Sequence, residues 1–307
     1  MKLSVVTTLY FSAGTILEFD ARIRKVALPL CSELEIIYVN DGSPDESGEI
    51  VLNKIVPFNR GTKYIELTRN FGHHKALMRG ISAAQGDLIF LIDSDLEEEP
   101  ELLLDYLGAL ENSNVELVEG IASVRNGSFV KRVLGKYAWK MISSLSNGLI
   151  VPDLITARIF TKRFQGLLLQ HKDKEIFIAG LFSHVGLRRL RIQVNKASLT
   201  PTTYSFRARL KLASMGITNY SDIPLRIILW LGFAVFLFTC AGIFAVISAY
   251  LLGLISIPGW TSLFLATTCF NSIVLISLGS MGLYLMRIFS EVKNRPLTLD
   301  ARVVSNE

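Results

Sequence analysis

Two aspartates, Asp93 and Asp95, carry the clearest chemistry in this sequence. They follow a short apolar run, residues 88–92, which reads as a buried parallel strand because it is too short to form a helix of its own. Ligands of open α/β sheets bind just beyond the carboxyl ends of the strands. Two carboxylates one residue apart at such a place form an oxygen site suited to Mg²⁺ or Mn²⁺, which substrate phosphates typically share. The sequence therefore predicts a divalent-metal site after this strand.

An acidic helix start is the competing interpretation of the same stretch. Acidic residues favour the first turn of a helix, and Pro100 followed by Glu101 is typical of such a start. This explains the three glutamates at residues 97–99. It does not explain Asp93 and Asp95 at the strand end, so we favour the metal site.

The elements that must position these carboxylates alternate between strand-like and helix-like runs from residue 3 to about residue 122. Such alternation predicts a mostly parallel, doubly wound α/β sheet. Strands are predicted at residues 2–8, 35–39, 63–67, 88–92 and 115–122. The sequence contains no glycine-rich phosphate loop of a standard pattern, so bound phosphates would need the metal.

Polar residues follow the ends of the first three predicted strands. Thr8 and Tyr10 lie at the end of the first strand, Asp41 follows the second, and residues 68–74 follow the third. On a parallel sheet these loops converge with the acidic pair at one edge and make a cleft of nucleotide size. Asp41 could accept a hydrogen bond from a base or ribose, and Tyr10 could stack on the base. The adjacent histidines of the third loop are interpreted as a surface or capping pair, because adjacent side chains diverge.

Composition divides the chain into a polar and an apolar part. Half of the 307 residues (50%) are hydrophobic and the mean hydropathy is +0.40, with the excess almost wholly after Pro224. A net charge of +5 and a pI near 9.1 then favour an anionic membrane face as partner. Nucleic acid is not an expected partner, because no basic run interleaved with aromatics and no binding motif occurs in the sequence. Three widely spaced cysteines predict neither a disulfide framework nor a zinc site.

Two apolar runs without charge, residues 227–252 and 261–286, are each longer than the roughly 20 residues that cross a bilayer. Basic residues stand on one side only, with Arg226 before the first run and Arg287 after the second, while the connecting residues 253–260 carry no charge. The positive-inside bias therefore predicts two transmembrane helices with both termini cytoplasmic. The strand-like N-terminus, which lacks a signal-peptide pattern, agrees with this expectation.

Two basic segments lie between these parts. Arg125, Lys131, Arg132, Lys136 and Lys140 read equally well as a solvated face or as a wall that binds the phosphate of an anionic acceptor. Residues 203–215 mix apolar and basic positions in the pattern of an amphipathic helix at a membrane surface, with a plain linker helix as the alternative.

A cytosolic nucleotide-and-metal domain joined to two spans could be a transferase, a transporter subunit or a scaffold. Two helices are too few for a transport pathway unless the chain oligomerises, and a scaffold leaves the acidic pair without a purpose. A transferase with a nucleotide donor and a lipid acceptor explains both parts. Glycines in the apolar runs permit close helix packing and hence a homo-oligomer.

Four short motifs, taken together, resemble a known family. They are Val-Asn-Asp-Gly-Ser at 39–43, Arg-Asn-Phe-Gly at 69–72, Gly-Asp at 86–87 and Asp-Ser-Asp-Leu at 93–96. With the two apolar runs they closely resemble family 2 glycosyltransferases, and within these the polyprenyl-phosphate glycosyltransferases similar to dolichyl-phosphate mannose synthase. The resemblance covers nearly the whole chain. It implies a GT-A (Rossmann-like) fold, a nucleotide-sugar donor, Mg²⁺ or Mn²⁺, and inverting transfer to undecaprenyl or dolichyl phosphate for cell-surface glycans.

The resemblance also implies roles for individual residues. Asp41 would contact the base, and Asp93 would lie near the ribose and diphosphate. The other nucleotide-binding residues would be Thr8, Tyr10, Arg69, Gly72 and Ser94. Asp95 would bind the metal, which Glu97 could approach from a place usually held by glutamine. Arg125 and Arg132 would hold the lipid phosphate and, with Asp93 and Asp95, form the catalytic set.

The departures from the family pattern fall in the first loop and in the acceptor and sugar region. Residues 8–12 replace the usual Pro-x-Tyr-Asn-Glu, and residues 155–158 keep only Arg158 of Gly-Asp-Phe-Arg. A later Arg-x-x-Gly-x-Ser-x-Tyr pattern is reduced to Lys196 and Tyr204. Direct glycan elongation and a non-catalytic scaffold that binds nucleotide therefore stay open as alternatives.

The expected organisation has four parts, in a chain located in a membrane of the bacterial inner-membrane type. These are a glycosyltransferase domain at 1–202, a juxtamembrane segment at 203–224, a transmembrane hairpin at 225–290 and a cytosolic tail at 291–307.

Overall fold

The structure is a computed structural model that describes residues 1–122, 154–174, 176–194 and 259–306, with scattered positions between 228 and 252. The predicted basic wall at 125–140 and the juxtamembrane segment at 203–224 lie outside the described residues, as does most of the first apolar run.

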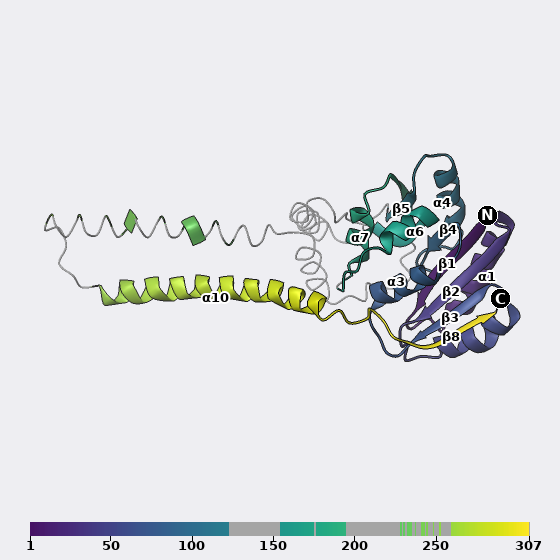
Figure 1. Ribbon diagram of the computed structural model, residues 1–307, viewed down its shortest axis with the longest axis horizontal. Coiled ribbons are helices and arrows are strands. Elements are labelled where there is room, and N and C mark those ends of the chain that lie inside the picture. The colour runs from purple at the N-terminus through teal and green to yellow at the C-terminus, as the bar shows by residue number, and fades with distance from the viewer. Residues whose placement is uncertain are drawn as a thin grey trace.

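An eight-stranded sheet forms the centre of the described domain (Figure 1). Its strands are β1 (Lys2–Leu9), β2 (Glu33–Asn40), β3 (Thr62–Leu67), β4 (Leu88–Leu91), β5 (Leu117–Ala122), β6 (Leu154–Thr161), β7 (Arg189–Val194) and β8 (Asp300–Asn306). Their order in the sheet is β7-β5-β6-β4-β1-β2-β3-β8. Strands β4, β1, β2 and β3 are parallel neighbours, whereas β6 and β8 pair antiparallel with the strands beside them. The prediction of an α/β domain with a mostly parallel sheet is confirmed.

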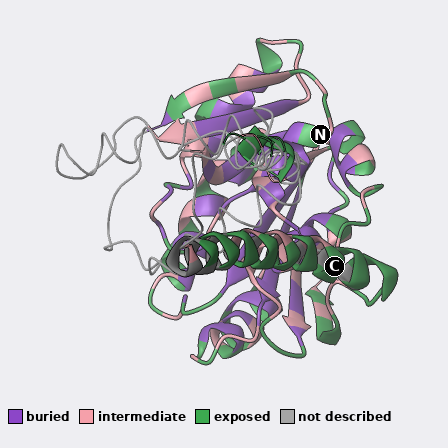
Figure 2. Cartoon of the chain, turned by 90° about the vertical axis from the view of Figure 1, so that its left-hand side faces the viewer, coloured by how far each residue is buried: buried purple, intermediate pink, exposed green. Residues whose placement is uncertain are grey.

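Helices cover both faces of the sheet because successive strand residues point to opposite sides. Val5 packs in one core cluster with helices α1 (Ile16–Ala27) and α4 (Leu102–Glu111), whereas the next residue, Val6, packs in a second cluster with the helices of the other face. Those helices are α3 (His73–Ala83), α6 (Lys162–Leu168) and α7 (Ile178–His184). Figure 2 shows the buried residues gathered in the sheet between these layers.

A helical segment joins β2 to β3. It consists of α2 (Ser47–Ile50), a π-helical turn (Val51–Ile55) and a 3₁₀ turn (Val56–Phe58). A further 3₁₀ turn (Leu28–Leu30) follows α1.

The end of the chain returns to the sheet, which the sequence pattern did not predict. Helix α10 (Trp260–Val292) begins far from the domain and runs back towards it, and β8 then pairs antiparallel with β3 along the sheet edge (Figure 1). Residues 300–306 of the expected tail are therefore part of the sheet. In the part of the chain that the structure describes, no helix combines the length and hydropathy needed to cross a membrane.

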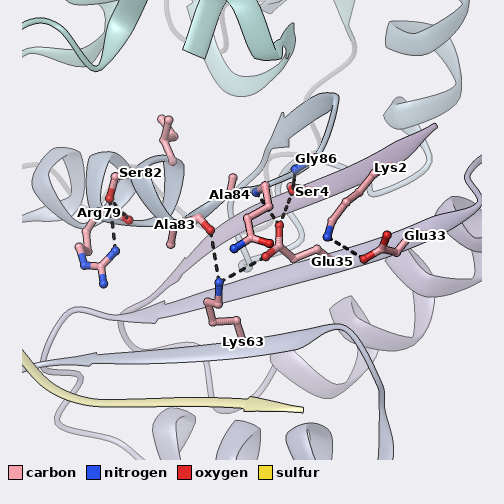
Figure 3. Close-up of polar contacts among 12 residues, drawn as sticks. Lys2, Ser4, Glu33, Glu35, Lys63, Arg79, Ser82, Ala83, Ala84 and Gly86 are labelled. Atoms are coloured by element: carbon pink, nitrogen blue, oxygen red, sulfur yellow. Dashed lines mark hydrogen bonds and ion pairs between the residues drawn. The ribbon is translucent and has the colours of Figure 1, made fainter. Parts of the chain in front are cut away.

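A buried carboxylate ties the amino ends of the central strands together (Figure 3). Glu35 accepts hydrogen bonds from the Ser4 hydroxyl and the Gln85 backbone N–H, and Lys63 Nζ lies 3.4 Å from its other oxygen. Gly86 donates to Ser4 Oγ in a turn where a Cβ would lie 2.6 Å from the Ser4 nitrogen. These contacts hold the turn before β4 against the amino ends of β1 and β2.

Candidate functional site

The polar loops predicted from the sequence share one edge of the sheet. Strands β4, β1, β2 and β3 are adjacent and parallel, so their carboxyl ends lie side by side. Thr8 is the second-last residue of β1, Asp41 follows β2, residues 68–72 follow β3, and Asp93 lies two residues beyond β4. The structure therefore brings together the predicted nucleotide and metal residues among those it describes.

Unusual backbone conformations concentrate in these loops. Among the described residues only three non-glycine residues have positive φ, and two of them, Phe11 (55°) and Leu96 (61°), lie after β1 and β4. Gly42 and Gly72 also have positive φ, and a Cβ on Gly42 would lie 2.7 Å from the Asn70 nitrogen. Strained backbone persists where the surroundings over-determine it, commonly at functional sites.

Asp41 organises the loop after β3. Its Oδ1 accepts the Phe71 N–H at 2.7 Å and its Oδ2 accepts the Gly72 N–H at 3.0 Å. Burial raises the pKa of the Asp41 carboxyl, and these two hydrogen bonds oppose the rise. The carboxylate thus joins two strand-end loops, and Arg69 in the second loop stacks on the Phe71 ring at 4.4 Å.

A second carboxylate, Asp45, joins the loops after β1 and β2, although no motif in the sequence marks this residue. It accepts hydrogen bonds from the Ser43 and Ser47 hydroxyls and from the Ala13 backbone N–H. Although partial burial raises the pKa of Asp45, these hydrogen bonds outweigh that effect and lower the pKa to about 2. The Ser43 hydroxyl also accepts the N–H of Phe11. This hydrogen bond holds the exposed rings of Tyr10 and Phe11 next to the loop after β2.

Ser94 serves the same structural purpose between β1 and β4. Its buried hydroxyl donates to the Thr8 carbonyl at 2.8 Å and lies 2.9 Å from the Ser12 hydroxyl. The Thr15 hydroxyl donates to the Ser94 carbonyl. These contacts commit Ser94 to fixing the two loops.

The acidic residues after β4 face different surroundings. Asp93 Oδ1 is buried and accepts no hydrogen bond from the described residues. Asp95 is exposed, and its Oδ1 accepts the Glu97 backbone N–H at 2.9 Å. Glu98 is buried and accepts the backbone N–H groups of Thr156 and Ala157. Glu98 is thus a structural tie to β6, whereas Asp93 and Asp95 lie just beyond the carboxyl end of β4.

The carboxylates after β4 suit a hard divalent cation whose remaining ligands are supplied by the substrate and by water. Across the described residues no group of three His, Cys, Asp or Glu side chains is arranged to hold a metal. Mg²⁺ usually keeps several waters and is bound by one or two carboxylates together with substrate phosphates. An exposed Asp95 beside the partly exposed Glu97 fits that mode of binding.

Two histidines at the start of α3 lie beside this acidic pair, and they are partly buried rather than the surface pair that the sequence suggested. His73 Nδ1 lies 3.1 Å from Thr8 Oγ1, and His73 Nε2 lies 3.6 Å from Asp93 Oδ1. His74 Nδ1 lies 3.1 Å from the Ile176 carbonyl, and burial, assisted by the neighbouring His73, lowers the pKa of His74 to about 4. Only the fold reveals these contacts, because they join residues far apart in the sequence.

A buried arginine, Arg158, lies on β6 beside the buried Glu119 of β5. Arg158 pairs with Leu91 across β6 and β4, and its guanidinium lies 4.6 Å from the Phe182 ring. Arg158 Nη1 and Glu119 Oε1 are 3.7 Å apart, and neither atom has a hydrogen bond to a described residue. Burial lowers the pKa of Arg158, while Glu119 opposes this. The predicted acceptor residues Arg125 and Arg132 lie outside the described residues.

Comparison with known proteins agrees with this geometry. The family model for glycosyl transferase family 2 matches residues 4–178. A Mycobacterium tuberculosis protein, itself named as a glycosyltransferase, is 34% identical over 309 residues, which cover 100% of this chain and 90% of its own. The glycosyltransferase YkcC of Bacillus subtilis is 31% identical over 96% of this chain and 91% of its own. The bactoprenol glucosyl transferase of Shigella phage SfII is 27% identical over 96% of each chain.

Proposed function

The chain belongs to the family 2 glycosyltransferases and is a nucleotide-sugar glycosyltransferase, and from this premise we propose that it transfers the sugar to a polyprenyl phosphate at a membrane. The observation that carries the donor half is the acidic pair at the joined ends of four parallel strands. The acceptor half is supported by the name of the phage relative, a bactoprenol glucosyl transferase, which is similar along nearly its whole length.

The donor nucleotide would bind across the ends of β1, β2 and β3. Tyr10 is half exposed and free to stack on a base, while Arg69 lies at the rim of the same cleft. The carboxylates of Asp41 and Asp45 are bonded to the loop backbone, so the cleft is preorganised before any ligand arrives. Preorganised loops lower the cost of ordering the site on binding.

We assign the divalent cation, Mg²⁺ or Mn²⁺, to Asp95, with Glu97 beside it. When bound, the cation supplies positive charge to the leaving nucleoside diphosphate. Asp93, two positions before Asp95, would lie near the ribose and diphosphate of the donor. In this proposal Asp93 contacts the donor directly, and Asp95 acts on the diphosphate through the cation.

The acceptor phosphate would attack the anomeric carbon from the side opposite the leaving group, which inverts the configuration. A phosphate monoester is already nucleophilic, so positioning and charge neutralisation are sufficient and no dedicated base is needed. We assign the positioning of this phosphate to Arg125 and Arg132, on the basis of their sequence positions.

The membrane location rests on the two charge-free apolar runs, residues 227–252 and 261–286, and on the one-sided basic residues. The described part of α10 carries large apolar side chains that are exposed, among them Leu275 at 68% and Leu285 at 63%. Exposed apolar surface of this extent needs a lipid or protein environment. Both termini would then lie on the cytoplasmic side. Resistance of the protein to alkaline extraction from membranes tests whether it is an integral membrane protein.

A transfer assay tests the whole proposal. The purified protein in detergent is incubated with undecaprenyl phosphate, Mg²⁺ or Mn²⁺ and each of a panel of radiolabelled nucleotide sugars. A metal-dependent labelled lipid, absent from the Asp95→Asn variant, is the expected product. Labelled polysaccharide without a lipid-linked intermediate would instead indicate direct glycan elongation, and nucleotide binding without transfer would indicate a non-catalytic scaffold.

A further inference from the structure

We propose that His73 is a positioning residue for the donor nucleotide, acting through Asp93. The inference rests on the proposed nucleotide site but concerns a residue outside the motifs that identify the family. His73 opens α3 and lies between two strand ends, with one ring nitrogen 3.1 Å from Thr8 Oγ1 and the other 3.6 Å from Asp93 Oδ1. Thr8 and Asp93 are 85 positions apart in the sequence, and the imidazole bridges them.

The carboxylate determines which atom of the ring carries hydrogen. A bare Nε2 would direct a lone pair at the Asp93 oxygen, which is unfavourable, so Nε2 carries a hydrogen whether the ring is neutral or charged. In the neutral ring Nδ1 then accepts from the Thr8 hydroxyl. The arrangement therefore does not depend on the protonation state of His73.

The unsatisfied oxygen of Asp93 explains why this contact matters for binding. Asp93 Oδ1 is buried and has no hydrogen bond among the described residues, and a buried carboxylate oxygen without a donor is costly. The nearest potential donor that the structure describes is His73 Nε2, which lies 3.6 Å from Asp93 Oδ1, slightly farther than a hydrogen bond. Catalytic contacts in ligand-free structures are often long and tighten when the substrate binds. Once Oδ1 is held by His73, Oδ2 is left to accept from a ribose hydroxyl.

The surroundings of His73 allow its side chain to move closer to Asp93 when a substrate binds. The side chains of His73 and Asp93 are 37% and 24% exposed, so a ligand at this edge of the sheet could reach both. His74 behind them is held by the Ile176 carbonyl and packs edge-on to Phe177, which fixes the start of α3. His73 can thus adjust to the donor while the helix that carries it stays in place.

Calorimetric titration of the full chain with a panel of nucleoside diphosphates (UDP, GDP, ADP, CDP and dTDP) in the presence of Mg²⁺ tests the inference. We expect His73→Ala to weaken binding of the preferred nucleotide roughly tenfold, the usual effect of losing one hydrogen bond to a charged group. His73→Gln, whose amide N–H can replace Nε2, should restore affinity to within about threefold of the wild type. The matched control, His184→Gln at the end of α7, should bind as the wild type does.

A double-mutant cycle separates positioning from simple packing. If His73 acts through Asp93, then His73→Ala should change affinity less than about twofold in an Asp93→Asn background. Equal losses in both backgrounds, or no rescue by glutamine, would overturn the inference while leaving the nucleotide site intact. A wild-type chain that binds none of the five nucleotides would overturn the proposed donor site as well.

Discussion

Arg79 in α3 and Asp300 at the start of β8 form a bidentate ion pair across 221 positions of sequence. Arg79 Nε lies 3.0 Å from both Asp300 oxygens and Nη2 lies 2.6 Å from one of them. One residue earlier, the Leu299 carbonyl accepts the N–H of Thr68, at the start of the loop that carries Arg69. Residues 299 and 300 are therefore joined to α3 and to the loop after β3, beside the proposed nucleotide site.

Removal of residues 299–307 should lower both thermal stability and nucleotide affinity, because β3 becomes an open edge and Thr68 loses its acceptor. Asp300→Ala alone should cost only about 0–1 kcal/mol, since a partly exposed ion pair contributes little. Thermal unfolding and nucleotide titration of both variants measure these effects. A truncated chain with unchanged nucleotide affinity would show that β8 is a mere edge cover.

If Asp95 holds the cation as proposed, Asp95→Asn should reduce sugar transfer by about a hundredfold or more, because the cation would lose a charged ligand where the diphosphate departs. The matched control is Glu99→Gln, a neighbouring exposed acid outside the cleft residues, which should retain activity. Initial rates at several Mg²⁺ and Mn²⁺ concentrations measure the difference. Wild-type rates in Asp95→Asn at low metal would contradict the assignment of this residue.

Asp45→Asn should destabilise the protein in a pH-dependent way. The folded pKa of about 2 lies below the ordinary value of 3.8, so the ionised carboxylate stabilises the fold above about pH 4. That contribution is lost as the pH falls from about 4 towards 2. Denaturant unfolding of wild type and variant should therefore differ at pH 6 and converge towards pH 2. A constant difference across this range would mean that hydrogen bonding to the charged form is not the cause.

Glu35→Ala should cost about 2–3 kcal/mol of stability, because it removes a buried carboxylate and leaves the Gln85 N–H and the Ser4 hydroxyl without their acceptor. Activity per folded molecule should stay the same, since Glu35 lies at the amino ends of the strands, opposite the cleft. The exposed Glu33, which pairs with Lys2, provides the control: Glu33→Ala should change stability by less than about 1 kcal/mol.

Gly42→Ala should impair nucleotide binding. The backbone there has a φ of 62°, and a Cβ would lie 2.7 Å from the Asn70 nitrogen, so the loops after β2 and β3 would have to separate. Nucleotide titration of this variant measures the effect. Gly108→Ala, at a helix position where a Cβ meets nothing within 4 Å, is the control and should bind normally.

The sequence alone predicted the parallel strands and the edge at which their polar loops meet. This succeeded because strand periodicity and the abrupt change from apolar run to Asp93 are local features, and parallel strands necessarily end together. It also placed Asp95 just beyond the end of β4, and the metal-binding role of this residue stays a prediction. These properties need no knowledge of distant contacts.

Only the tertiary structure decided which partner each polar residue at the carboxyl edge of the sheet contacts. Asp41 is bonded to Phe71 and Gly72, Ser94 is committed to the Thr8 carbonyl, and His73 bridges Thr8 and Asp93. It also decided that the last strand completes the sheet beside β3. Each of these facts is a contact between residues distant in sequence, set by strand order and loop geometry. Local patterns of hydrophobicity do not encode such contacts, because the same pattern is compatible with many arrangements of neighbours.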